Sequence, residues 1–392
     1  MSKLTRRTTV MAKTNDGAYG ADPTPTAGAN GILCNMTPLP QPQGNLVERN
    51  TIRDTMSPQG HVIGVKSMQT DFEMELKGGS LNGTVQDPEF HPFLLASGMQ
   101  KETGNLLTAA SGEDVSALTL GETITGGASS ATGKVVGYIG TDAGEFCVAD
   151  VSGTFQDGET VTGGTSSATV DLAASNAVEE IPIYRPQSNP ASVQDVAVYY
   201  NMDGTQMQLL GGICDMSLNM SVDNYARMTF RMSSLYSTPT AVGLPSPTTL
   251  DLSPPVCRNL GLTVGSWAPT AINALTLSLN NVVSQRNDIS DSDGILDFLI
   301  TNRDTQGSID PEVTAIGTYD VYTAWENGTT AAIQAVLGGS KGNRIVPFVP
   351  KSMWRSISHS DRQGYQTYNL PFTCRIDSQG GAGDDELYLS FA

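Results

Sequence analysis

The chain has 392 residues, of which only 16% are charged, and it contains 41 glycines and 21 prolines. Globular chains have about 25% charged residues, so this composition favours a β-rich fold with many turns. The formal net charge is −18, from 40 acidic and 22 basic residues. Proteins that grip nucleic acid need a basic surface, and membrane-spanning helices need about 20 apolar residues in a row. The sequence shows neither feature, so both functions are excluded.

Five cysteines, Cys34, Cys147, Cys214, Cys257 and Cys374, are odd in number and far apart. This spacing predicts free, mostly buried thiols in a reducing compartment rather than a disulfide framework. The first residues, MSKLTRRTTVMAKTNDG, lack the apolar centre of a secretory signal. We therefore expect no secretion signal and no structural disulfides.

The N-terminal part of the chain predicts an arm, a strand and a helix. Residues 1–55 are rich in turn residues without a sustained apolar period, which is typical of an arm that wraps its own domain or lies along a neighbour. In DFEMEL, residues 71–76, apolar and acidic residues alternate as in a half-buried strand. Asp87-Pro88-Glu89 then has the order of an N-cap, a first helical position and a first-turn acid.

A short segment of the chain occurs twice. GETITGGASSAT, residues 121–132, returns as GETVTGGTSSAT, residues 158–169, with ten of twelve positions identical. The segments around both copies alternate apolar and polar residues between Gly-rich turns. Residues 103–187 are therefore predicted to form a small antiparallel β module inserted into a loop of the host domain, where insertion costs little entropy.

Two hairpins and a linker follow the module. The strand patterns SVQDVAVYY and TQMQLL flank NMDG, which predicts a turn at Asp203-Gly204. A second hairpin is predicted around Asp223-Asn224. Residues 241–256 are rich in Ser, Pro and Thr, which is typical of a linker.

Past the linker, the same order of elements returns in residues 257–392. The strand ILDFLI leads to Asp310-Pro311-Glu312 and a helix predicted to end before Gly328, and hairpins follow at GGSKGN and DRQG. This order predicts two tandem domains, each a β-sandwich or barrel with a flanking helix. The first would comprise residues 56–102 and 188–240. A chance similarity between two β-rich halves is the alternative.

No candidate catalytic, cofactor or metal site stands out. GGSKGN lacks the spacing of a phosphate loop and joins two strands, and NDISDSDG, residues 287–294, lacks calcium-loop ligands at the required positions. The histidines, His61, His91 and His359, have no metal-ligand spacing. A Ser-His-Asp triad stays open, because its members meet only in the fold, but no nucleophile-elbow motif is present. We expect a protein that is not an enzyme.

The acidic side of DFEMEL is the one candidate functional surface. Asp71, Glu73 and Glu75 share one face of the predicted strand. The simplest interpretation of these three acids is the ordinary solvated face of a half-buried strand. A functional hypothesis is a wall that repels DNA, since carboxylates still repel phosphates across a Debye length of about 8 Å.

Several segments resemble the tail tube, or major tail, proteins of bacteriophages with long non-contractile tails. They are AKTNDGAYGADPTPTAGANGILC, VERNTIRDTMSPQGHVIGVKSMQTDFEMELKG, TNRDTQGSIDPE, GNRIVPFVPKSMWRSISHSDRQGYQTYNLPF and GDDELYLSFA. Together they cover nearly the whole chain except the module. The resemblance implies stacked rings that form a hollow, acid-lined tube for DNA, with six tube domains per ring. Two domains per chain then predict three chains per ring, with the module on the exterior.

The resemblance also implies partners and location. Copies of the chain would contact each other, the tape measure, tail terminator and distal tail proteins, and DNA passing through the lumen. Assembly would occur in the cytoplasm of the host bacterium, the mature location would be the virion tail, and the module would be free to touch the host surface. The rival hypothesis is a surface adhesin or carbohydrate-binding β protein. It requires a secretion signal and clustered exposed aromatics; the module has Tyr138, Phe146 and Phe155, and the chain shows no signal.

Overall fold

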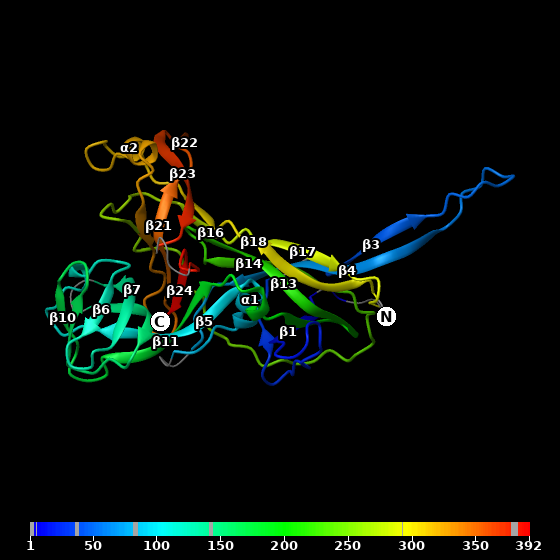
Figure 1. Ribbon diagram of the computed structural model, residues 1–392, viewed down its shortest axis with the longest axis horizontal. Helices are drawn as coiled ribbons and strands as arrows, with labels where there is room; N and C mark the ends of the chain where they lie inside the picture. The colour runs from blue at the N-terminus through cyan, green and yellow to red at the C-terminus, as the bar shows by residue number, and fades with distance from the viewer. Residues whose placement is uncertain are drawn as a thin grey trace.

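The computed structural model describes residues 4, 6–35, 39–80, 85–140, 144–291, 293–377 and 383–392. Strands dominate these residues, so the mainly β fold class is confirmed. Figure 1 shows the first half in the centre, the insert at the lower left and most of the second half above the insert, whereas the hairpin of residues 282–302 of the second half lies in the centre against the first half. A β-hairpin projects from the first half toward the upper right.

Each part has its own strands, and each half has a short helix. The first half comprises β1 (Thr8–Thr14), β2 (Gly31–Ile32), β3 (Gln41–Glu48), β4 (His61–Glu75), α1 (His91–Ala96), a 3-10 turn at Pro190–Ser192, β12 (Val196–Met202), β13 (Thr205–Ser221) and β14 (Arg227–Leu235). The insert comprises β5 (Met99–Thr108), a 3-10 turn at Val115–Ala117, β6 (Thr123–Gly126), β7 (Thr132–Ile139), β8 (Glu145–Ser152), β9 (Thr160–Gly163), β10 (Thr169–Asp171) and β11 (Val178–Pro186). The second half comprises β15 (Thr263–Val264), β16 (Ala274–Ser278), β17 (Val282–Asn287), β18 (Ile295–Asn302), β19 (Gln306–Ile309), α2 (Val321–Glu326), β20 (Ala331–Gln334), β21 (Ile345–Trp354), β22 (Ser358–Arg362), β23 (Tyr365–Arg375) and β24 (Tyr388–Phe391).

Both predicted hairpins of the first half are confirmed. β12 and β13 pair up to Met202 opposite Thr205, which leaves Asp203 and Gly204 as a two-residue turn, both with positive φ. Such a turn matches the twist of hairpin strands. β13 then continues to a second turn near Asp223 and pairs with β14. The two hairpins therefore share one strand of 17 residues.

One antiparallel sheet runs through both halves, and we call it the shared sheet. β13 pairs with β14 of the first half and with β16 of the second half. β14 pairs onward with β4, β16 with β19, and β19 with β23. One hydrophobic cluster lies under these strands and includes residues of both helices; in it the Phe93 ring of α1 lies 5.2 Å from Phe72 and 5.3 Å from Phe230. The two halves thus share a sheet and a core.

The N-terminal segment contains a strand that the sequence pattern did not predict. β1 pairs with β12 over seven residues, from Thr8 opposite Met202 to Thr14 opposite Val196. Its three central residues are buried in a row rather than in alternation, so no period of two was readable. This part of the segment therefore lies along its own chain.

The start of the first helix was predicted wrongly. α1 begins at His91, and its N-cap residue is Phe90 rather than Asp87. The Asp87 carboxylate instead accepts a hydrogen bond from Lys101 Nζ at 2.8 Å. The local sequence pattern predicted Asp87 as a helix cap, but in the folded chain its carboxylate pairs with Lys101 instead.

The second helix ends as predicted but starts later. α2 has Asp320 as its N-cap residue and stops before Gly328, whereas Asp310 was the predicted start. Asp310 instead accepts the backbone N–H of Ala274 at 2.7 Å and pairs with Arg362 at 2.6 Å. It therefore closes the sheet edge rather than opening a helix.

The insert packs against the second half. β5 and β11 form its stem, and β11 also pairs with β24 of the second half. A hydrophobic cluster joins Val136 and Cys147 of the insert to Phe348 and Tyr388 of the second half. The Tyr138 N–H also donates to Gln334 Oε1 at 3.0 Å. The insert is thus held on a second surface besides its stem.

The two copies of the short repeat pair with each other. Each copy forms a hairpin, β6 with β7 and β9 with β10. β6 and β9 then pair in a symmetric register, with Ile124 opposite Gly163 and Gly126 opposite Val161. The repeat therefore builds a four-stranded unit with a local two-fold axis between β6 and β9.

A carboxylate from each copy closes the turn of the other. Glu122 accepts the Ser166 N–H at 2.8 Å and its hydroxyl at 2.7 Å. Glu159 accepts the Ser129 N–H and hydroxyl, both at 2.9 Å. Each glutamate is only 5% exposed. Burial raises the pKa of both carboxyls, but the hydrogen bonds from the opposite turn, together with those from the Thr119 N–H to Glu122 and from the Gln156 N–H to Glu159, outweigh it and lower each pKa below its ordinary value.

Replacing either glutamate should loosen both turns. We expect Glu122→Gln and Glu159→Gln to destabilise the insert equally, by about 1–2 kcal/mol, because each weakens charge-assisted hydrogen bonds to buried N–H groups. Hydrogen exchange of the Ser129 and Ser166 amides measures the effect. Glu180→Gln, at an exposed position, is the matched control.

The same contacts predict an acid-sensitive insert. A carboxyl with a lowered folded-state pKa adds stability above its unfolded value, 4.5 for Glu122, and this stability is lost as the pH falls through the folded-state pKa. Protection corrected for intrinsic exchange should therefore fall below about pH 4.5 in the native chain. It should fall less in Glu122→Gln. An equal pH dependence in both proteins would contradict the assignment.

Candidate functional site: the polar face of the shared sheet

One face of the shared sheet lies against the core. The opposite face is polar along the rows described below, whereas at one end its Val65, Ile213 and Leu235 pack in a separate cluster with Ile295 and Phe298 of β18. Alternation along each strand separates the two sets of side chains. One row of the core face runs across six strands through Met74, Met228, Leu218, Leu277, Gly307 and Phe372. The adjacent row on the other face runs through Glu73, Thr229, Ser217, Ser278, Gln306 and Thr373. Over these six strands the polar row has no apolar side chain, and on the next strand, β21, Met353 stands opposite Thr373.

We call this side of the sheet, from β4 to β23, the polar face. It contains the three acids singled out from the sequence, on β4, and neighbours on the next five strands. Its members are Asp71, Glu73, Glu75, Arg227, Thr229, Arg231, Asp215, Ser217, Asn219, Thr276, Ser278, Gln306, Ser308 and Thr373. The alternation predicted for DFEMEL is confirmed, because Phe72, Met74 and Leu76 are buried.

Arginines of β14 lie beside the acids of β4. Arg227 Nη1 lies 3.0 Å from Glu73 Oε1, and Arg231 Nε lies 3.5 Å from Asp71 Oδ1. Glu75 stands opposite Arg227 in the ladder. Exposed ion pairs stabilise by about 0–1 kcal/mol, so these contacts matter more for local charge than for stability. The sequence pattern missed them because the two strands are far apart in the chain.

β13 adds one more acid to the polar face. Asp215 stands opposite Arg231 and accepts the Asn281 N–H at 2.8 Å. Burial raises the pKa of this carboxyl above its ordinary value, against the lowering by that hydrogen bond. Over β4, β14 and β13 the polar face thus has four carboxyls and two guanidinium groups. β16 and β19 add no charged side chain to this face: besides hydroxyl and amide groups, Ala274 stands on it.

GGSKGN lies in a turn between β20 and β21 and fastens the halves together. Its Asn343 accepts the Gly78 N–H at 2.9 Å and donates to the carbonyl of Ser253 at 3.0 Å. Nearby, buried Lys77 pairs with Glu89 at 3.1 Å and donates to the carbonyl of Leu250 at 2.6 Å. The turn therefore joins the first half, the linker and the second half, and the sequence-based rejection of a phosphate loop agrees with this role.

The other sequence candidates lie apart from one another. Within NDISDSDG, whose Ser292 lies outside the described residues, Asp291 accepts the Asp293 N–H at 2.8 Å and closes a turn. His91 Nδ1 lies 2.8 Å from the Tyr184 hydroxyl, and burial lowers its pKa. No group of three or more metal-ligating side chains occurs among the described residues. All five cysteines are free, as expected.

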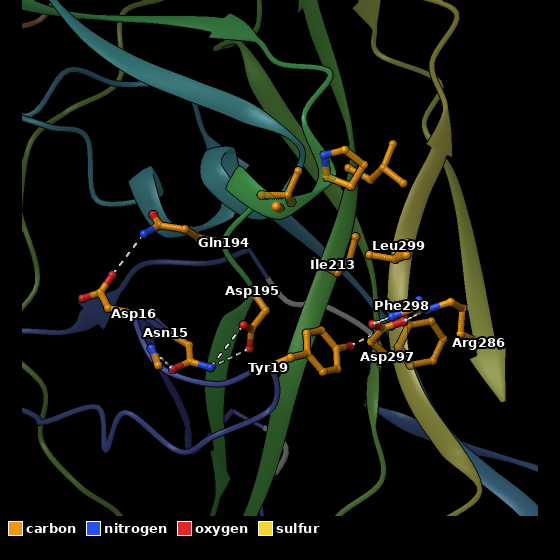
Figure 2. Close-up of a pocket in the computed structure, with 15 residues that line it drawn as sticks. Asn15, Asp16, Tyr19, Gln194, Asp195, Ile213, Arg286, Asp297, Phe298 and Leu299 are labelled. Carbon is orange, nitrogen blue, oxygen red and sulfur yellow. Dashed lines mark hydrogen bonds and ion pairs between the residues drawn. The ribbon is translucent and has the colours of Figure 1, made fainter. Parts of the chain in front are cut away.

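A pocket of about 520 Å³ lies where the N-terminal segment meets β13 and β18. Figure 2 shows its polar side chains turned toward one another. Asn15 Nδ2 donates to the buried Asp195 carboxylate at 3.1 Å, and Arg286 Nε donates to Asp297 at 2.6 Å. The Tyr19 hydroxyl donates to the Gly211 carbonyl at 2.5 Å and accepts the N–H of Phe298 at 3.0 Å. The bonds of Tyr19 join the first half to β18 of the second half, so the pocket is a structural junction.

The β3–β4 hairpin is the most exposed feature of the described residues. Every residue of β3 and of the loop up to residue 57 is exposed. Its apolar side chains include Leu46, Ile52, Met56 and Ile63, with Ile52 and Met56 fully exposed. Large exposed apolar groups mark interaction surfaces. The hairpin extends away from the rest of the chain (Figure 1), which suits contact with another molecule.

The junction at Gly78 generates a stability prediction. A Cβ at this position would overlap the carbonyl oxygen of Gly342. We expect Gly78→Ala to lower the free energy of unfolding by about 1–3 kcal/mol, as overpacking does. Gly339→Ala, in the same GGSKGN turn but with open space around its Cβ, is the control. Equal melting temperatures for both variants would contradict the close approach.

The comparisons with known proteins agree with this geometry. No helix among the described residues is long and apolar enough to cross a membrane. No match was found among curated proteins. A family model described as phage tail tube protein matches residues 5–374. This match covers nearly the whole chain, so the chain belongs to the phage tail tube protein family, and it is a structural component of a phage tail.

Proposed function

We propose that copies of this chain assemble into rings, three chains to a ring, and that the rings stack into the hollow tail tube through which phage DNA passes. The observation that carries the proposal is the polar row from Glu73 to Thr373, which runs over six neighbouring strands drawn from both halves. A tube wall needs a face of this kind on its inner side. We assign the polar face to the lumen.

Three chains per ring follow from the proposal that the chain holds two tube domains. The order of pairing supports it, because β12, β13 and β14 of the first half correspond to β20, β21 and β23 of the second. A flanking helix precedes each set. Residues 241–256, which contain no helix and no strand, serve as the linker. Six tube domains then need three chains.

The lumen surface suits passage without binding. Hydroxyl and amide groups offer DNA no fixed charge, and the carboxyls of Asp71, Glu73 and Glu75 repel phosphates. Arg227 and Arg231 reduce this repulsion locally. The net charge of the β4, β14 and β13 part stays negative. DNA would therefore slide past a wall that holds it only weakly.

The β3–β4 hairpin would contact the next ring. Its exposed apolar side chains need cover, and a protruding strand edge otherwise pairs at random. The tube ends would meet the tape measure, tail terminator and distal tail proteins. Assembly would take place in the host cytoplasm before the tail joins the virion.

The insert would lie on the outer surface of the tube, where it could touch the host. Its hydrophobic clusters contain no residue of the polar face. The adhesin hypothesis gains no support from its aromatics. Phe146 and Phe155 are buried, and the Tyr138 hydroxyl donates to the carbonyl of Leu118, so the three form no exposed platform for a sugar.

Charge reversal tests the lumen assignment. We expect Asp71→Lys, Glu73→Lys and Glu75→Lys together to leave tube assembly intact and to reduce DNA delivery roughly tenfold, because lysines in the bore would hold phosphates. Tube length by electron microscopy and infectivity per particle are the measurements. The control places the same charge change at exposed Glu180, Asp251 and Glu326.

Two outcomes would contradict the proposal. If assembled particles of the triple-lysine variant keep the native infectivity, the assignment of β4 to the lumen is wrong. Class averages of native rings with six outer projections, rather than three, would leave the tube but contradict three chains per ring.

A further inference from the structure

β22 has an open edge. Among the described strands it pairs only with β23. On the far side of β23, Tyr368 N donates to Pro311 and Gln366 O accepts from Val313. The alternate residues of β23 therefore face β22, as Thr367 does opposite Ser360. By the same alternation, the N–H and C=O groups of His359 and Asp361 point to the open edge.

In the first half, the strand edge that corresponds to β22 is covered, because the end of β13 pairs with β16. Ladder rows align the two halves residue by residue. The row Gln41, Gln69, Ser233, Ile213 of the first half matches the row Ser278, Gln306, Thr373, Met353 of the second. The start of β3 thus corresponds to β16. Continuing along β14 and β23, Thr229 matches Asn369, so Ser217 of β13 matches Ser358 of β22.

The pairing of β13 with β16, which we call the internal joint, shows how the two ends of the sheet would pair between copies. Inside the chain, Ser217 of the first half stands opposite Ser278 of the second, which continues the sheet from one half to the other. The corresponding residues at the two ends of the sheet are Ser358 and Gln41. Both lie on exposed segments, and among the described strands neither has an outer neighbour.

We propose that β22 of one copy lies beside the start of β3 of the next copy, with Ser358 opposite Gln41, so that the shared sheet continues from chain to chain. The proposal rests on the ring proposed above and names the surfaces that close it. The contact is heterologous, and contacts of this type close into rings when the rotation allows.

Prolines make this joint different from the internal one. Inside the chain, the N–H of Leu279 donates across the joint to the carbonyl of Met216 at 3.0 Å. Pro42 and Pro40 occupy the positions that match Leu279 and Leu277, and proline has no N–H to donate. Hydrogen bonds can run only from the N–H groups of β22 to the proline carbonyls. The joint between copies is therefore the weaker one, and free copies are protected from premature pairing.

Disulfide cross-linking of mixed single variants tests the register. Chains with Gln41→Cys are mixed with chains with Ser358→Cys, assembled and oxidised, so that only a contact between two copies can join them. We expect a covalent dimer in the mixture and none with either variant alone. Ser217→Cys with Ser278→Cys in one chain is the control, and it should cross-link within the chain without forming a dimer.

The outcomes separate the two proposals. Tubes that form without a dimer, while the control pair cross-links, overturn this joint and leave the tube function standing. A protein that forms no ring or tube at any concentration, with or without other tail proteins, overturns both. A dimer in the assembled mixture supports the joint.

A separate experiment tests whether the prolines of β3 weaken the joint between copies. Pro42→Thr restores one N–H at the joint, and one net hydrogen bond corresponds to a roughly fivefold lower protein concentration for assembly. Pro58→Thr, in the exposed hairpin loop, is the matched control. Equal assembly thresholds for Pro42→Thr and the native chain overturn the one-way joint.

Discussion

The ladder between β13 and β16 is the interaction on which the arrangement of this chain depends. It is five residue pairs long, yet it joins two sheets into one and places the polar sides of both on one face. The linker, which has no helix or strand, cannot fix that orientation by itself. The contacts around Gly78 and Asn343 reinforce it from the side. A continuous polar wall exists only because this ladder holds.

The acidity of the chain has two different uses. Asp71 and Glu73 point from the sheet and define a surface. Glu122, Glu159 and Asp195 are each about 5% exposed, and their oxygens accept hydrogen bonds from backbone or amide groups. A chain with few lysines and arginines can use carboxylates in this way, since N–H groups are good partners for them. The net charge therefore overstates how acidic the surface is.

Short-range features were predictable from the sequence, and long-range partners were not. The alternation in DFEMEL and the turn at Asp203-Gly204 depend on neighbouring residues, so both predictions hold. The predicted helix starts were wrong because Asp87 and Asp310 contact partners that are distant in the chain. The three acids of the polar face were found from alternation alone. The arginines beside them were not, because pairing between β4 and β14 leaves no local trace.

The short repeat and the long repeat that we propose for the two halves make contacts of different symmetry. In the short repeat, each copy offers the other the same surface, with Glu122 and Glu159 exchanging roles about a two-fold axis. Such a contact satisfies both copies and ends there. In the long repeat, β13 of the first half meets β16 of the second, two different surfaces. That contact leaves one unmatched edge at each end of the sheet. The symmetry of these contacts thus accounts for the closed module and for the open-ended wall that we propose in the same chain.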